Sequence, residues 1–159
     1  MKLRERRSRK PLTLTSRAGS RSWQRRLGEE VLTPATIANS VIAGNAATAI
    51  APHGQAVVLG AGLVNQGPLL LQNDLITLNK GTVHGQTELA QGGGIYNGST
   101  WSPGGPITLQ NTSVIGNVLA GDVGATLQGA GLYTVGFPAT LTHSLVAHNS
   151  PDQCVGVSC

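Results

Sequence analysis

The sequence is poor in aromatic and charged side chains and contains no long apolar run. Five of its 159 residues are aromatic, and charged residues make up 11% of the chain. Surface helices need Lys, Glu and Arg, so this composition excludes a mainly helical domain. No apolar run approaches the roughly eighteen residues of a membrane-spanning helix. A secretory signal needs about seven to fifteen apolar residues after its basic start, and residues 11–17 interrupt any such stretch. We therefore expect no transmembrane segment and identify no signal peptide.

The few charges are placed unevenly. Residues 1–30 contain ten of the eleven basic side chains and three acids, a net charge of +7, whereas the remainder has Lys80 against four acids, a net charge of −3. Basic runs of this kind are usually disordered, so we predict a disordered basic leader over residues 1–32. Its cations could bind nucleic acid or an anionic surface by counterion release, which is one alternative function. The segment has no recognisable binding motif, so nucleic acid is not the partner we expect.

What the sequence has instead is an internal repeat. Four eleven-residue segments share one pattern of apolar and Thr positions, with Asn at the eleventh place and Asn, or His in the fourth segment, at the fifth: residues 35–45, 69–79, 107–117 and 139–149. The closing set is Asn45, Asn79, Asn117 and Asn149, and the inner set is Asn39, Asn73, Asn111 and His143. Members of both sets are 34, 38 and 32 residues apart. Periods of this size indicate a solenoid, a propeller or an array.

A glycine-led element recurs between these segments. Its glycines are 32 and 37 residues apart, at Gly62, Gly94 and Gly131. We interpret them as turn glycines, which permit a positive φ or a close approach where the chain re-enters a strand. They lack the third glycine and the helix of a dinucleotide-binding fingerprint.

The residues at the repeating positions predict strands. Gly, Thr, Asn and β-branched residues fill these positions, and helix formers do not. The Leu frame of a leucine-rich repeat is missing, and only Asn97-Gly98 resembles the hairpin turns of a propeller. We predict an all-β, right-handed parallel β-helix of three to four coils over residues 33–153, with a tail at residues 154–159. Inward residues should stack about 4.8 Å apart, namely Ile37, Leu71, Leu109 and Leu141. The eight ladder positions should form corners and bond along the stack.

Three segments resemble a known group of proteins. Gly92-Gly-Gly-Ile-Tyr-Asn97, followed by the repeat over residues 107–117, is similar to the repeats of bacterial right-handed parallel β-helix proteins, which include the chlamydial polymorphic outer membrane proteins. Residues 149–154 resemble the segment that often follows the last regular coil of such proteins. The resemblance covers about residues 35–156. It implies an extracellular or cell-surface location and, because such proteins are usually longer, a fragment or remnant of a larger one. The pectin lyase-like fold also serves lyases, polygalacturonases and tailspikes, so function follows from it less directly.

The sequence offers few side chains for the enzymatic chemistry of this fold. Polysaccharide lyases of this shape use calcium-binding acidic clusters with an Arg or Lys base, but no Arg follows Arg26 and Lys80 is the only later Lys. Glycosidases need paired carboxylates. The acids here are separated in sequence, and we interpret them as solvated loop charges: Asp74, Glu88, Asp122 and Asp152. We predict no catalytic residue.

The histidines do not predict a metal site. His53 and His84 are each followed by Gly in successive repeats, so they could approach each other on one flank. A metal would want at least a third ligand, and we find no Cys or acid in register with them. We therefore predict no metal and no cofactor.

Two further features lie in irregular segments. Trp101 belongs to the longest insertion, residues 97–106, where it could stack on a sugar ring or fold back over the loop; this insertion begins with the sequon Asn97-Gly-Ser. Cys154 and Cys159 could form a short disulfide or remain free thiols.

We expect a non-enzymatic surface or secreted protein that acts in adhesion or surface display, through loops around residues 80–91 and 97–106. Its expected partners are a carbohydrate or a host or cell-surface protein. A carbohydrate-active remnant is the main alternative.

Overall fold

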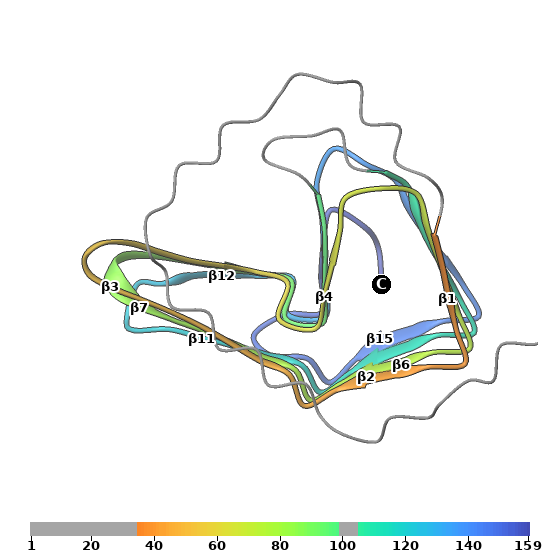
Figure 1. The fold of residues 1–159 in the computed structure, drawn as a ribbon, viewed down its shortest axis with the longest axis horizontal. Coiled ribbons are helices and arrows are strands. Elements are labelled where there is room, and N and C mark those ends of the chain that lie inside the picture. The colour runs from red at the N-terminus through yellow and green to blue at the C-terminus, as the bar shows by residue number, and fades with distance from the viewer. Residues whose placement is uncertain (1–34, 99–104) are drawn as a thin grey trace, which may run out of the picture.

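A computed structural model of the chain describes residues 35–98 and 105–159; the predicted leader, residues 1–32, lies outside them. The described residues form an all-β solenoid of stacked parallel strands, which confirms the predicted fold class. Three complete coils are followed by a shortened fourth. The chain winds clockwise as it recedes from the viewer in Figure 1, so the solenoid is right-handed. In this part of the chain there is no helix of the length and apolarity that would cross a membrane.

The coils build four sheets of four strands each. Sheet A contains β1 (Ala35–Ala38), β5 (Leu69–Gln72), β9 (Ile107–Gln110) and β14 (Ala139–Thr142). Sheet B contains β2 (Val41–Ala43), β6 (Leu75–Thr77), β10 (Ser113–Ile115) and β15 (Leu145–Ala147). Sheet C contains β3 (Ala46–Leu59), β7 (Lys80–Gln91), β11 (Val118–Ala120) and β12 (Thr126–Gln128). Sheet D contains β4 (Leu63–Asn65), β8 (Ile95–Asn97), β13 (Leu132–Thr134) and β16 (Cys154–Val155).

Apolar side chains stack in register inside the solenoid. The expected column of sheet A is present: Ile37, Leu71, Leu109 and Leu141 occupy equivalent positions. A second column in sheet B consists of Ile42, Ile76, Val114 and Val146. Members from the two middle coils are fully buried, whereas Ile37 and Ile42 of the first coil are only partly buried. A coil therefore completes its core only when it has a neighbour on each side.

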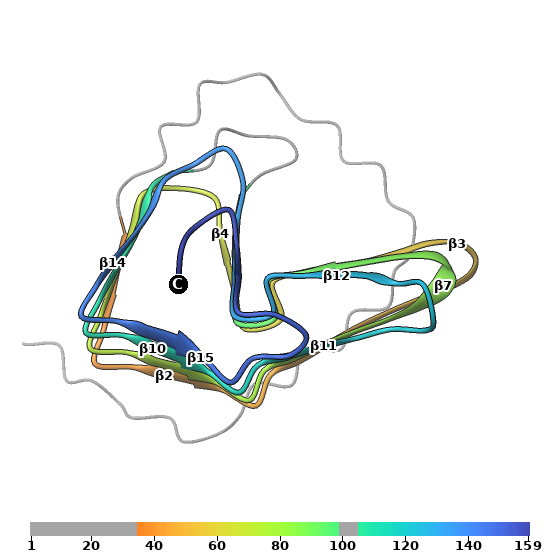
Figure 2. The same cartoon turned by 180° about the vertical axis from the view of Figure 1, so that it is seen from behind.

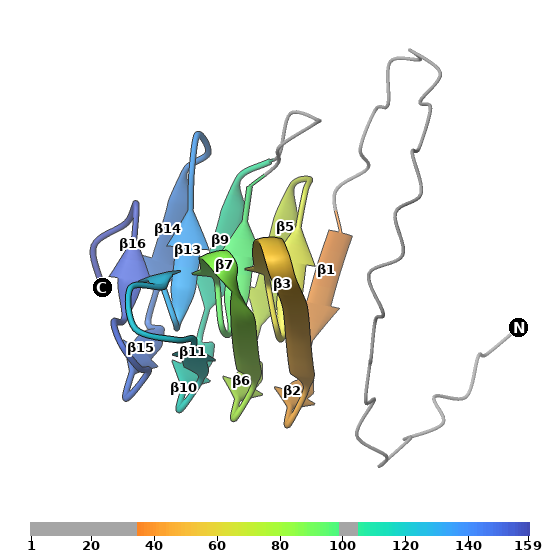
Figure 3. The ribbon, with the colours of Figure 1, turned by 90° about the vertical axis from the view of Figure 1, so that its left-hand side faces the viewer.

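One side of the solenoid extends into a lobe that the sequence did not predict. β3 and β7, of 14 and 12 residues, each run outward, turn and return, as Figures 1 and 2 show. In the third coil β11 runs outward, residues 121–125 make the turn and β12 returns. We call residues 46–59, 80–91 and 118–128 the lobe; Figure 3 shows its coils from the outer end. Residues 80–91, which we expected to form a loop, are thus a strand.

The lobe has its own narrow core of small side chains. The buried residues are Ala56, Val58, Val83, Ala90, Leu119 and, two residues after β12, Ala130; Ala47, Ala49 and Ala51 pack against them. A Cβ added to Gly81 would lie 2.8 Å from Cδ2 of Leu119. The outgoing and returning halves of each coil pack directly on each other, so small residues are what fits between them.

Candidate functional site

The closing asparagines form a continuous ladder along the solenoid. The side-chain Nδ2 atoms of Asn45, Asn79 and Asn117 each donate to Oδ1 of the next closing asparagine at 2.9 Å. Each acceptor Oδ1 also receives the backbone N–H of the asparagine one coil earlier. Asn79 and Asn117 are fully buried. A satisfied polar chain of this kind in the interior fixes the register of one coil on the next.

The inner set has a different role from the one expected. Asn39, Asn73, Asn111 and His143 are exposed, and their φ angles lie between 48° and 56°. Only one amide bond links these four described residues, from Nδ2 of Asn73 to Oδ1 of Asn39 at 3.3 Å. They are therefore corner residues in the left-handed conformation, which Asn tolerates, and they do not form a continuous ladder. At the closing corners the residue before each asparagine is left-handed instead, with φ of 56–68°: Gly44, Leu78, Gly116 and His148.

The three turn glycines make room for the asparagine ladder. Their φ angles are not positive; the positive values belong to Gly60, Gly92 and Gly129, two residues earlier. A Cβ on Gly94 would lie 2.7 Å from the carbonyl oxygen of Gly131 and 2.9 Å from Nδ2 of Asn117. Gly62 and Gly131 face Asn79 and Asn149 in the same way. These positions need glycine because backbone and amide approach closely.

A second polar column follows the inner corner and includes one carboxylate. It consists of Ser40, Asp74, Thr112 and Ser144. In each step the side-chain oxygen accepts the backbone N–H of its equivalent one coil earlier, at 2.7–3.3 Å. Asp74 also accepts the backbone N–H of Gln72 at 2.9 Å and is buried. The interpretation of Asp74 as a solvated loop charge is therefore wrong, because its carboxylate is buried and accepts hydrogen bonds from backbone N–H groups.

A third column lies on sheet D. Asn65 donates to Oδ1 of Asn97 at 2.7 Å, Asn97 donates to the hydroxyl of Thr134 at 3.0 Å, and that hydroxyl donates to the carbonyl of Phe137. Asn97 is fully buried. The first sequon of the sequence thus begins with a structural amide that is closed to solvent.

The C-terminal segment caps the last coil. Asp152 accepts the backbone N–H groups of Gly129 and Ala130 at 3.0 and 2.9 Å. In the earlier coils these donors bond to carbonyls of the next coil, as Gly60 does to Gln91. Gln153 accepts from Asn149 where a fifth ladder asparagine would stand. Cys154 and Cys159 form a disulfide, so the tail predicted from residue 154 begins inside β16.

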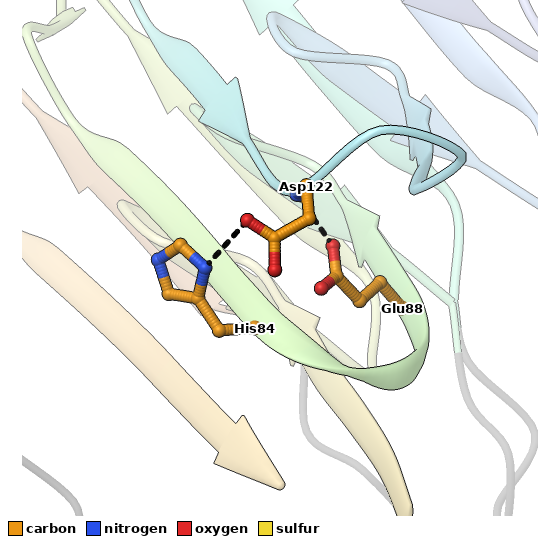
Figure 4. Close-up of side chains that lie close together, drawn as sticks. All are labelled: His84, Glu88 and Asp122. Carbon is orange, nitrogen blue, oxygen red and sulfur yellow. Dashed lines mark hydrogen bonds and ion pairs between the residues drawn. The ribbon is translucent and has the colours of Figure 1, made fainter. Parts of the chain in front are cut away.

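A cluster of three ionisable side chains lies at the outer end of the lobe. Nδ1 of His84 is 3.1 Å from Oδ1 of Asp122, and Glu88 lies on the other side of the aspartate (Figure 4). Glu88 accepts the backbone N–H of Gly85 at 2.7 Å and that of Asp122 at 2.8 Å. One ligand atom from each side chain lies within 4.8 Å of the others. The side chains of His84 and Asp122 are 47% and 64% exposed, so solvent reaches the cluster.

The cluster corrects two expectations from the sequence. The residue of the first coil in register with His84 is Ile50, not His53, because a register shift separates Ala51 from Gln55. The interval from His84 to Asp122 is the 38 residues that separate Asn79 from Asn117, so an acid does follow the repeat. An open groove beside the cluster is lined by residues 85–88 and 122–126.

Two stacked tyrosines lie on sheet D. The rings of Tyr96 and Tyr133 are 5.5 Å apart between centroids and nearly parallel. Tyr96 is 4% exposed. Burial raises the pKa of the Tyr96 hydroxyl, and the neighbouring Tyr133 raises this pKa further.

Trp101, the binding residue suggested by the sequence, lies outside the described residues. Residues 80–91 belong to the lobe, whereas the described ends of the insertion of residues 97–106 adjoin β8 of sheet D and β9 of sheet A. Its middle, residues 99–104, lies outside the described residues, as Trp101 does.

Comparison of the chain with protein-family models, with curated proteins and with solved structures found no match.

Proposed function

We propose that this protein is a non-enzymatic β-solenoid that acts in adhesion or surface display, with the lobe as its presenting surface. The use of its carboxylates supports this best. Asp74, Glu88 and Asp152 each accept two backbone N–H groups. Acids held in this way stabilise the backbone of a corner, a cap or the outer end of the lobe, and they are poor candidates for the paired acid and base of glycoside hydrolysis.

The lobe has the shape and surface of a display element. Three stacked coils project it from the solenoid, and three large apolar side chains, Ile50, Val57 and Val123, are exposed on it. The adjoining groove carries the Glu88 and Asp122 carboxylates. Apolar side chains beside polar groups suit a carbohydrate or a cell-surface protein as partner.

The disulfide supports an extracellular or cell-surface location. Bonds of this kind persist in oxidising compartments and are rare in the cytosol. The Cys154–Cys159 bridge joins β16 to the end of the chain, next to the cap. It fits the location implied by the resemblance of the repeats to bacterial surface β-helix proteins.

The test is binding without turnover. The purified chain would be presented to immobilised polysaccharides and cell-surface glycoproteins, while product release is followed as new reducing ends and unsaturated sugars. We expect binding to at least one class without product. Val123→Asp should weaken this binding on the order of tenfold, as loss of an interface anchor does. Val135→Asp, an exposed Val just after β13, is the matched control and should leave binding unchanged. Product formation would favour the carbohydrate-active alternative, and equal losses in both variants would remove the lobe from the proposal.

A further inference from the structure

We propose that His84, Glu88 and Asp122 bind a divalent transition-metal ion such as Zn²⁺ at the outer end of the lobe. This inference goes beyond the proposed function and does not depend on it. The three side chains offer one imidazole nitrogen and two carboxylates, a donor set that suits Zn²⁺ and its neighbours better than Ca²⁺ or Mg²⁺, which prefer oxygen alone. Water would complete the coordination.

The spacing of the donors is close to what a metal needs. Ligand atoms at about 2.0–2.2 Å from a tetrahedral Zn²⁺ are roughly 3.3–3.5 Å from one another. His84 Nδ1 and Asp122 Oδ1 are 3.1 Å apart. One ligand atom from each of His84, Glu88 and Asp122 lies within 4.8 Å of the other two. A small rotation of the exposed His84 and Asp122 side chains therefore brings all three onto one ion. In Figure 4 the Asp122 carboxylate lies between His84 and Glu88.

The backbone around the cluster is already organised. His84 and Glu88 both belong to β7, and Asp122 follows β11, which pairs with β7 in parallel register. Glu88 is held by two backbone N–H groups, and each of its oxygens keeps a second lone pair for a metal. A Cβ on Gly121 would lie 2.6 Å from Oε2 of Glu88, so glycine there leaves space for the carboxylate. These contacts position one ligand before the ion arrives, which is how outer-shell bonds tune a site.

The ligand set does not recur in the first coil, although Asp122 follows His84 at the interval of the asparagine ladder. In the first coil the positions in register with His84 and Glu88 are Ile50 and Ala56, which have no ligand atoms. The three ionisable groups therefore meet at one level of the lobe only. That placement is expected of a local site and not of a stacking device.

The experiment is calorimetric titration of the full, untagged, non-reduced chain with Zn²⁺, together with its melting temperature with and without the metal. We expect one site per chain and a higher melting temperature with Zn²⁺. His84→Ala should weaken the affinity for Zn²⁺ by at least about tenfold, because loss of even an outer-shell partner of a ligand lowers metal affinity by that much. Asp122→Asn should do the same without removing the side chain. His53→Ala is the matched control, since it removes a nearby exposed histidine outside the cluster.

A cobalt spectrum checks the donor set without relying on stability. Co²⁺ bound to the wild-type chain should show visible bands that His84→Ala changes and His53→Ala does not. No Zn²⁺ binding by the folded chain would overturn the proposal. Binding that His84→Ala and Asp122→Asn leave intact would overturn it as well, because the ion would then lie elsewhere.

Discussion

Gln153 takes the place of a fifth asparagine in the closing ladder of Asn149. Its Oε1 accepts the backbone N–H of Asn149 at 3.0 Å and the side-chain amide at 3.1 Å, the two bonds that each ladder asparagine gives to the next. Gln153 also donates Nε2 to the carbonyl of Asn149 at 2.9 Å. The solenoid therefore ends with its polar column satisfied, as terminal coils require.

Replacing Gln153 by Leu should destabilise the protein, because it removes the acceptor at the end of the asparagine ladder. Two donors of the largely buried Asn149 would lose their acceptor, at about 1–3 kcal/mol each before relaxation. We expect the free energy of unfolding to fall by about 2–4 kcal/mol in a denaturant titration. Gln128→Leu is the control, because among the described residues the side chain of Gln128 bonds only to that of the partly exposed Gln91; an equal loss there would contradict a capping role.

The two asparagine sets should respond differently to substitution. Asn117→Ala removes the Oδ1 that accepts two N–H groups of Asn79, and it removes the side-chain donor to Oδ1 of Asn149 while the backbone donor remains. We therefore expect a loss of about 3 kcal/mol or more. Asn111→Gly keeps the left-handed corner of an exposed residue and should change stability by less than about 0.5 kcal/mol. Thermal unfolding of both variants measures the contrast, and equal effects would mean that the two sets share one role.

Gly94 should not tolerate even one methyl group. The added Cβ would meet the backbone oxygen of Gly131, Cγ1 of Val114 and Nδ2 of Asn117, all at 2.7–2.9 Å. We expect Gly94→Ala to cost about 3 kcal/mol, since the neighbours are backbone or buried side chains. Gly54→Ala meets nothing within 4 Å at an ordinary φ and should raise stability by about 0.4–1 kcal/mol. Chemical denaturation of the pair separates steric contact from backbone entropy.

The sequence repeat predicted the parts of the fold that recur in every coil. It did not predict the parts that occur only once or differ between coils. The inward columns and the closing ladder follow from residues spaced at the period, and the structure has both in register. The lobe was missed because its glycines resemble turn residues, although its alanines line a narrow core. The cap by Asp152 and Gln153 has no second copy to reveal it. The pairing of His84 with Asp122 could have been found by applying the 38-residue interval of the ladder to every residue of that coil.

Leu78 has the left-handed backbone conformation at a corner where two of the other coils have glycine. Its φ is 56°, whereas Gly44 and Gly116 occupy the equivalent corners, and its side chain is 69% exposed. The left-handed conformation costs a non-glycine residue about 1–2 kcal/mol, more than the roughly 0.5–1 kcal/mol of chain entropy that glycine adds. We expect Leu78→Gly to stabilise the protein by about 0.5–1 kcal/mol. Gly116→Leu, the reverse change one coil later, should destabilise it; a stabilising result there would remove the conformational argument.

The hydroxyl group of Tyr96 should make stability fall at alkaline pH. Its pKa is raised in the folded state, by burial first and by Tyr133 second, so the folded state binds this proton more tightly than the unfolded state does. The contribution is fully present below the ordinary tyrosine pKa of about 10 and is lost as the pH rises toward the raised folded value. We expect the melting temperature to drop above about pH 10, with tyrosinate absorbance appearing together with unfolding. Tyr96→Phe should flatten this part of the profile, and a profile identical to wild type would show that another group causes the drop.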